Sequence, residues 1–186
     1  MNLALAQRDL SCMVVVDMQE KLAAAMAADA MQAVVRNCSL LIQAATLLEI
    51  PVIHTEQYPK GLGPTLPELA ELLPSQRPIE KITFSCTDEP TFYRQLIRDR
   101  RHIVLAGIEA HICILQTALR LKQQDPTREI FVAEDAVISR NSSARMNAME
   151  RLRQAGVIVS NSESIVFEWL GKAEGDVFKQ ISRLLR

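Results

Sequence analysis

The sequence predicts an α/β fold, a three-layer sandwich in which a mostly parallel sheet carries helices on both faces. Short apolar runs of strand type alternate with segments of helical periodicity, which is typical of a parallel sheet. The run at residues 11–19 is apolar until it ends in Asp17 and Gln19, as in a strand buried on both faces. Because 186 residues suit one sizeable core better than two, we expect a single domain over residues 1–186.

Five short strands and one irregular extended segment are expected. Apolar and β-branched residues dominate the strands, and proline or glycine stands near several of their ends. The extended segment, residues 79–86, carries Lys81. The strands are expected at residues 11–19, 52–55, 102–106, 129–133 and 157–159.

Helices are expected between the strands. The alanine- and leucine-rich stretch 20–50 has no internal proline or glycine and predicts one long or broken helix, which Pro51 ends. A loop rich in proline and glycine, residues 56–64, follows the second strand and is a candidate pocket wall. The other helices are expected at residues 66–73, 90–99, 111–124, 142–154, 162–170 and 175–185.

Composition and charge narrow the functional classes. The net charge is -1, and we interpret the one basic group, Arg98, Arg100 and Arg101, as a solvated loop face, so no nucleic-acid partner is expected. No apolar run reaches the about 18 residues of a membrane helix, so no membrane partner is expected. No phosphate-binding glycine motif is present, and no cofactor is expected. Widely spaced cysteines and the lack of a signal peptide predict reduced thiols in a cytoplasmic protein.

The clearest candidate nucleophile is Cys113. A strand-like run breaks at Gly107 and continues as a helical pattern, so Cys113 falls in the first turn of the expected helix. Free N–H groups and the helix dipole favour a thiolate there, and the same N–H groups are suited to hold an oxyanion. The alternative is an ordinary buried cysteine, since free cysteine is among the most buried residue types.

Two charged residues are candidate partners of this thiol. Asp17, at the end of an apolar strand, is suited to act as a partly desolvated base, and Lys81 is suited to hold the carboxylate and favour the thiolate. Asp17 is equally suited to cap the next helix, and most lysines are exposed. Residues two apart on a helix do not face each other, so His111 is expected to cap or lie at the surface. Glu109 either contacts substrate or caps the helix.

Three segments together resemble the isochorismatase-like cysteine hydrolases, closest to the isochorismatase-domain-containing subgroup. They are Val-Val-Asp-Met-Gln at 15–19, Glu-Lys-Ile-Thr-Phe-Ser at 80–85 and Gly-Ile-Glu-Ala-His-Ile-Cys at 107–113; the subgroup is indicated by residues 55–69. The resemblance implies a sheet of about six strands and a catalytic triad of Asp17, Lys81 and Cys113. It also implies a non-proline cis peptide at Glu109–Ala110, in a turn (Glu109, Ala110, Cys113) that directs N–H groups at an oxyanion.

The resemblance further implies an amidohydrolase that cleaves a C–N bond of a small-molecule substrate through a Cys113 thioester, with Asp17 as base and Lys81 as charge stabiliser. Glu56 and Tyr58 stand where nicotinamidases have metal ligands, so no metal is expected. By family analogy a homo-oligomer is expected. Gln19, Gln57, Tyr58 and Phe84 are predicted to line the substrate pocket.

Other functions stay open at this point. In isochorismatase-type enol ether hydrolysis Asp17 would protonate the substrate and Cys113 would be a spectator. A non-catalytic binding or scaffold protein would have no need of an acid, a lysine and a cysteine together. A thiol sensor would require a resolving partner for Cys113, with Cys86 or Cys12 as candidates.

Overall fold

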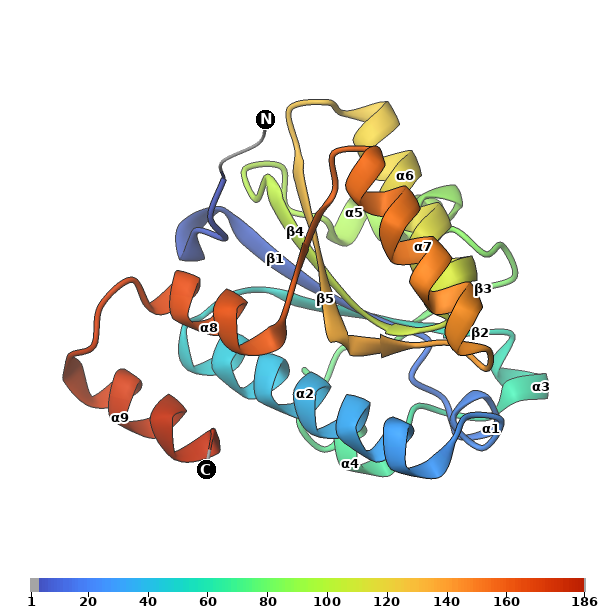
Figure 1. The fold of residues 1–186 in the computed structure, drawn as a ribbon, viewed down its shortest axis with the longest axis horizontal. Coiled ribbons are helices and arrows are strands. Elements are labelled where there is room, and N and C mark those ends of the chain that lie inside the picture. Colours follow the sequence, from blue (N-terminus) through green and yellow to red (C-terminus); the bar gives the residue numbers. More distant parts are fainter. Residues whose placement is uncertain (1–3, 186) are drawn as a thin grey trace.

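The computed structural model describes residues 4–185 and contains one sheet of six parallel strands, which confirms the predicted fold class (Figure 1). The strand order is β3-β2-β1-β4-β5-β6, so the chain starts at the centre of the sheet and builds outward in two directions. The direction in which the chain adds strands changes between β1 and β4. In sheets of this kind ligands bind beyond the carboxyl ends of the strands at that point. The strands are β1 (Ser11–Val16), β2 (Val52–Gln57), β3 (Ile79–Lys81), β4 (His102–Ile108), β5 (Glu129–Ile138) and β6 (Ile158–Ser160).

Helices cover both faces of the sheet and divide the core into two clusters. One cluster packs under α2 (Ala28–Leu47), α4 (Pro67–Ala70), α8 (Ser162–Leu170) and α9 (Gly175–Leu184). The other packs under α5 (Pro90–Gln95), α6 (Leu115–Gln124) and α7 (Ser142–Gln154). The short elements are η1 (Arg8–Leu10), α1 (Glu20–Ala23), α3 (Pro59–Leu62), η2 (Cys86–Asp88) and the π-helix η3 (Ala110–Ile114). Within residues 4–185 no helix combines the length and the apolar character needed to cross a membrane.

Several boundaries differ from the sequence predictions. The stretch 20–50 takes the broken form of the two predicted, since α1 and α2 are separated where Met26 is buried and Ala27 is extended, and α2 ends at Leu47 rather than near residue 50. Helix α5 stops at Gln95 because Leu96 adopts extended backbone and buries its side chain. Strand β5 continues to Ile138, beyond a register shift opposite Leu105 and Gly107.

The parallel register brings the predicted site residues to one edge of the sheet. Val16 at the end of β1 pairs with Thr55 of β2 and with Gly107 of β4. Gln57 at the end of β2 pairs with Lys81 of β3. Side chains that follow these positions in the chain therefore emerge together beyond the carboxyl ends of the strands.

Gly107 allows β1 and β4 to approach each other at this edge. Its φ is +128°, in a region that side chains other than glycine rarely adopt, and an added Cβ would lie 2.0 Å from the carbonyl oxygen of Val16. The break in the sequence pattern at Gly107 therefore marks a close backbone contact between neighbouring strands.

Substitution of Gly107 by alanine should strongly destabilise the protein. The new methyl group collides with the main chain of Val16 and the backbone is strained, so we expect the free energy of unfolding to fall by more than about 3 kcal/mol. Gly156→Ala is the matched control, because Gly156 also has positive φ (+77°) but its Cβ would meet nothing within 4 Å. The free energy of unfolding of the Gly156→Ala variant should fall by only about 1 kcal/mol. Urea denaturation measures both, and equal losses would contradict the close-contact explanation.

Candidate active site

A buried ion pair between Asp17 and Lys81 occupies the carboxyl edge of the sheet. The Lys81 Nζ lies 2.6 Å from Asp17 Oδ2, and both side chains are fully buried. Asp17 follows the last residue of β1 with φ of +50°, and Lys81 ends the edge strand β3. Charges are costly to bury unless they are paired and hydrogen-bonded, so this arrangement depends on the surrounding acceptors and donors.

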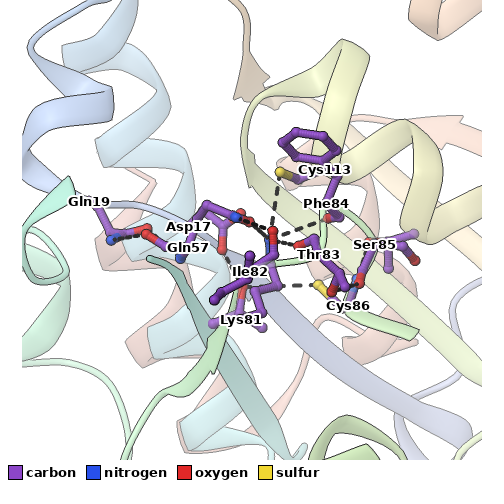
Figure 2. A network of polar contacts seen from close by, with 12 residues as sticks. Asp17, Gln19, Gln57, Lys81, Ile82, Thr83, Phe84, Ser85, Cys86 and Cys113 are labelled. Atoms are coloured by element: carbon purple, nitrogen blue, oxygen red, sulfur yellow. Dashed lines mark hydrogen bonds and ion pairs between the residues drawn. The ribbon is translucent and has the colours of Figure 1, made fainter. Parts of the chain in front are cut away.

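The Lys81 ammonium has contacts besides Asp17. It donates to Gln57 Oε1 at 2.6 Å and lies 3.3 Å from the carbonyl oxygens of Thr83 and Phe84. The Cys113 Sγ is 3.6 Å away (Figure 2). The segment after β3 therefore curls around the lysine, and its main chain helps to hold the charge.

These contacts keep Lys81 protonated. Burial alone lowers the pKa of Lys81, but the nearby Asp17, Cys113 and Cys86 groups raise it, and the pKa lies above its ordinary value. A pKa raised above the ordinary lysine value means that Lys81 carries its positive charge at neutral pH. The structure places it between a carboxylate and a thiol, where a cation stabilises any negative charge on either.

Cys113 lies in the π-helix η3, which follows β4, rather than in the first turn of an α-helix as predicted. Cys113 is only 6% exposed. Burial and the Asp17 carboxylate raise the pKa of the thiol to about 12, while Lys81 opposes the rise. The predicted preference for a resting thiolate is therefore wrong, because desolvation outweighs the helix terminus and the lysine. Cys113 rests as a neutral thiol.

The cis peptide bond lies one residue earlier than predicted. It joins Ile108 to Glu109, not Glu109 to Ala110, and is the first peptide bond beyond β4. Ile112 and Ile114 both donate their N–H groups to the Glu109 carbonyl oxygen in the turn that follows. The oxyanion role of Glu109, Ala110 and Cys113 stays a prediction.

Glu109 and His111 bind the loop after β5. The buried Glu109 carboxylate accepts hydrogen bonds from the Arg140 main-chain N–H and from its guanidinium Nε, both at 3.1 Å. His111 Nδ1 lies 2.9 Å from Ser139 Oγ. These contacts fix the turn against β5, and neither side chain contacts Lys81.

The four residues predicted to line the pocket take different positions. Gln57 binds Lys81, whereas Gln19 is fully buried and holds the loop after β2: its amide donates to the Gln57 and Gly63 carbonyl oxygens and accepts from the Gln57 N–H. Tyr58 and Phe84 are each 53% exposed. A cavity of about 450 Å³ lies beside β3, and its lining includes Tyr58, Lys81 and Ile82.

Thr55 also contacts the site, although the sequence did not single it out. Its hydroxyl donates to Asp17 Oδ1 at 2.7 Å, and its carbonyl oxygen accepts from the Asp17 N–H. Thr55 therefore orients the carboxylate from the neighbouring strand. Only the pairing of Val16 with Thr55 reveals this role, and a single sequence does not give that register.

Potential metal ligands near the site are otherwise engaged. The Glu56 carboxylate accepts hydrogen bonds from the N–H and the hydroxyl of Thr65, both at 2.7 Å. Among residues 4–185, no group of three or more histidine, cysteine, aspartate or glutamate side chains has an arrangement that could hold a metal ion.

The fold and the site together define a parallel α/β protein with a buried acid, lysine and cysteine at the sheet edge. Residues 11–164 match the isochorismatase domain, and the chain belongs to the isochorismatase family. Isochorismatase domain-containing protein 2 from Danio rerio is 42% identical over 82% of this chain and 76% of its own length. The human protein of the same name is 39% identical over 82% of this chain and 73% of its own length.

Solved structures agree with this membership. A structure of MAR1 ribonuclease from Caenorhabditis elegans superimposes with a TM-score of 0.90 at 36% identity, over 98% of this chain and 92% of its own. The YcaC gene product of Escherichia coli, described as an octameric hydrolase of unknown specificity, gives a TM-score of 0.89 at 21% identity, over 100% of this chain and 91% of its own. At that identity the second likeness shows the fold alone.

The raised pKa of Cys113 predicts a slow, pH-dependent reaction with iodoacetamide. Below its pKa the thiolate fraction rises about tenfold per pH unit, so alkylation should accelerate without a plateau from about pH 6 to about pH 10. Asp17→Asn removes a carboxylate that raises the pKa of Cys113 and should speed alkylation at neutral pH. Peptide mass mapping separates Cys113 from the other cysteines. A wild-type plateau near neutral pH would instead indicate a resting thiolate.

The Asp17–Lys81 pair should show strong energetic coupling. Asp17→Asn or Lys81→Met leaves one buried charge without its partner and should cost about 3–5 kcal/mol of unfolding free energy. The double variant removes both charges and should recover most of that loss. Urea denaturation of the four proteins measures the coupling; additive losses would show that the pair does not act as a unit.

Proposed function

We propose that this protein hydrolyses an amide-type C–N bond of a small molecule through a thioester on Cys113. The observation that carries the proposal is the placement of one buried ammonium, Lys81 Nζ, 2.6 Å from the Asp17 carboxylate and 3.6 Å from the Cys113 sulfur. A candidate nucleophile, base and cation meet there in a buried site, where electrostatic stabilisation is stronger than in water.

In the first half of the reaction Asp17 accepts the thiol proton while the sulfur attacks the carbonyl carbon. The C–N bond then breaks, and the leaving nitrogen takes the proton from Asp17, so ammonia or an amine departs. In the second half Asp17 takes a proton from water, which attacks the thioester carbon. The C–S bond breaks, the proton returns to the sulfur, and Lys81 remains an ammonium throughout.

The raised pKa of Cys113 is compatible with this sequence. Because the thiol pKa is about 12, a free thiolate is scarce at neutral pH, and proton transfer has to accompany the attack. Asp17 is held for that transfer by Thr55 and Lys81, one on each carboxylate oxygen. The turn at residues 109–113 is proposed to stabilise the oxyanion.

The substrate is proposed to reach Cys113 past Tyr58 and Phe84. Both side chains are half-exposed, and in Figure 2 the Phe84 ring projects to the side of the site where Cys113 lies. The Gln57 side chain accepts a hydrogen bond from the buried Lys81 ammonium. Gln19 donates to the Gln57 carbonyl oxygen, next to Tyr58 in the chain. A cytoplasmic location, a homo-oligomeric state and the lack of a nucleic-acid partner remain predictions of the sequence analysis.

Two other reactions have less support. The enol ether reaction gives Cys113 no role, although its sulfur lies 3.6 Å from the same ammonium that pairs with Asp17. Ribonuclease activity is named for the Caenorhabditis elegans relative. In this chain the cation of the site, Lys81, is buried and engaged by Asp17 and Gln57, which leaves it poorly placed to bind an RNA backbone.

The proposal predicts that Cys113→Ala abolishes amide hydrolysis. A panel of neutral primary carboxamides, assayed by ammonia release, identifies a substrate of the wild-type protein. On that substrate Cys113→Ala should lower kcat by at least about a thousandfold, because the covalent route is lost. Cys38→Ala is the matched control, since Cys38 is a buried cysteine of α2 whose thiol donates to the Ala136 carbonyl oxygen. Intact-mass analysis of quenched wild-type turnover should show the acyl adduct.

The same variants discriminate the enol ether reaction. If Cys113→Ala retains full turnover and Asp17→Asn loses it, the cysteine is a spectator and the thioester mechanism is wrong. Isochorismate serves as the probe for that outcome.

A further inference from the structure

A second cavity lies at the amino edge of the sheet, opposite the candidate active site. It has a volume of about 470 Å³. Leu10 immediately precedes β1, Arg101 precedes β4 and Arg128 precedes β5, so three central strands begin at this cavity. The lining consists of Leu10, Arg98, Asp99, Arg101, Asp125, Thr127 and Arg128.

Arg128 has an unused hydrogen-bond donor. Its side chain is 12% exposed, and its Nε donates to Asp125 Oδ2 at 3.0 Å. The Nη1 atom is buried and has no hydrogen-bond partner, the single such side-chain atom within residues 4–185. A buried donor without an acceptor is costly, and for a charged group the cost is larger. The guanidinium therefore has one donor that no side-chain or main-chain acceptor among the described residues engages.

The charge of the cavity favours an anion. Three arginines face two aspartates, and the Asp125 carboxylate is already engaged by Arg128 and by the N–H and hydroxyl of Thr127. Arg100 adds positive charge nearby, although its guanidinium donates to the Arg8 carbonyl oxygen. The basic group that the sequence suggested to be a solvated loop face thus meets Arg128 from a distant part of the chain.

We propose that this cavity binds a phosphate-type oxyanion. A tetrahedral oxyanion offers several acceptor oxygens at once, and planar guanidinium groups bind it in bidentate fashion. With Nε held by Asp125, the terminal nitrogens of Arg128 supply the donors for the anion. Arg98 and Arg101 then bind the anion from the solvent side. The cavity is large enough for inorganic phosphate or for the phosphate of a small monoester.

Titration with inorganic phosphate tests the site. Binding is measured by isothermal titration calorimetry and by the rise in Tm, and sodium chloride at equal ionic strength is the control. Arg98→Gln and Arg101→Gln are the main variants, because both side chains are exposed and their loss should leave the fold intact. Each should weaken phosphate binding about tenfold, the loss of one charge-assisted hydrogen bond. Arg36→Gln, which removes an exposed arginine of α2 outside the cavity, is the matched control and should bind like the wild type.

Glycerol 3-phosphate distinguishes the two sources of this chemistry. Tighter binding than inorganic phosphate would identify a phosphate monoester as the ligand, and binding of inorganic phosphate alone would identify the free ion. The proposal is overturned if chloride at equal ionic strength reproduces the shift in Tm. It is also overturned if the Arg98→Gln/Arg101→Gln double variant responds to phosphate as the wild type does.

Discussion

The buried ion pair of Asp17 and Lys81 constrains the rest of the candidate site. Removing both charges from water costs several kcal/mol per ion, and the Coulomb attraction offsets this only when hydrogen bonds satisfy the remaining donors and acceptors. Here Thr55 binds the second oxygen of Asp17, while Gln57 and the carbonyl oxygens of residues 83 and 84 surround the ammonium. The register of β1, β2 and β3 and the curl of the chain after β3 are therefore needed for the pair to exist.

The pair also determines the state of Cys113. The thiol lies beside a carboxylate and an ammonium whose effects on its pKa oppose each other, and burial then dominates and keeps it protonated. The nucleophile is therefore protonated before attack, unlike the cysteine of a preformed thiolate and imidazolium pair. In the proposed reaction the base acts during the attack, and the lysine stabilises whichever partner carries the negative charge at each stage. Lys81 is suited to this proposed role because its contacts raise its pKa.

Much of this arrangement could be predicted from the sequence, because apolar runs and chain order carry it. Strands ending near Asp17 and Gly107 follow from their composition, and the parallel sheet follows from their alternation with helices. Two features could not be predicted. The role of Thr55 depends on strand register, and the π-helix around Cys113 lies where a regular α-helical turn was expected. A broken helix was one of the two forms predicted for residues 20–50, but the position of the break was not predicted, because no proline or glycine marks it.

The two edges of the sheet differ in how well their residues can be recognised from the sequence. At the carboxyl edge, three separate segments contain residue types whose chemistry is recognisable before the fold is known. At the amino edge the arginines are unremarkable in sequence: Arg98, Arg100 and Arg101 lie in one loop, and Arg128 stands far along the chain. Parallel pairing of β4 with β5 places Arg101 beside the start of β5, where its carbonyl oxygen accepts the Glu129 N–H. Because parallel strands all begin at the same edge, residues that precede different strands are brought together there, and a positively charged cavity arises without a local sequence motif.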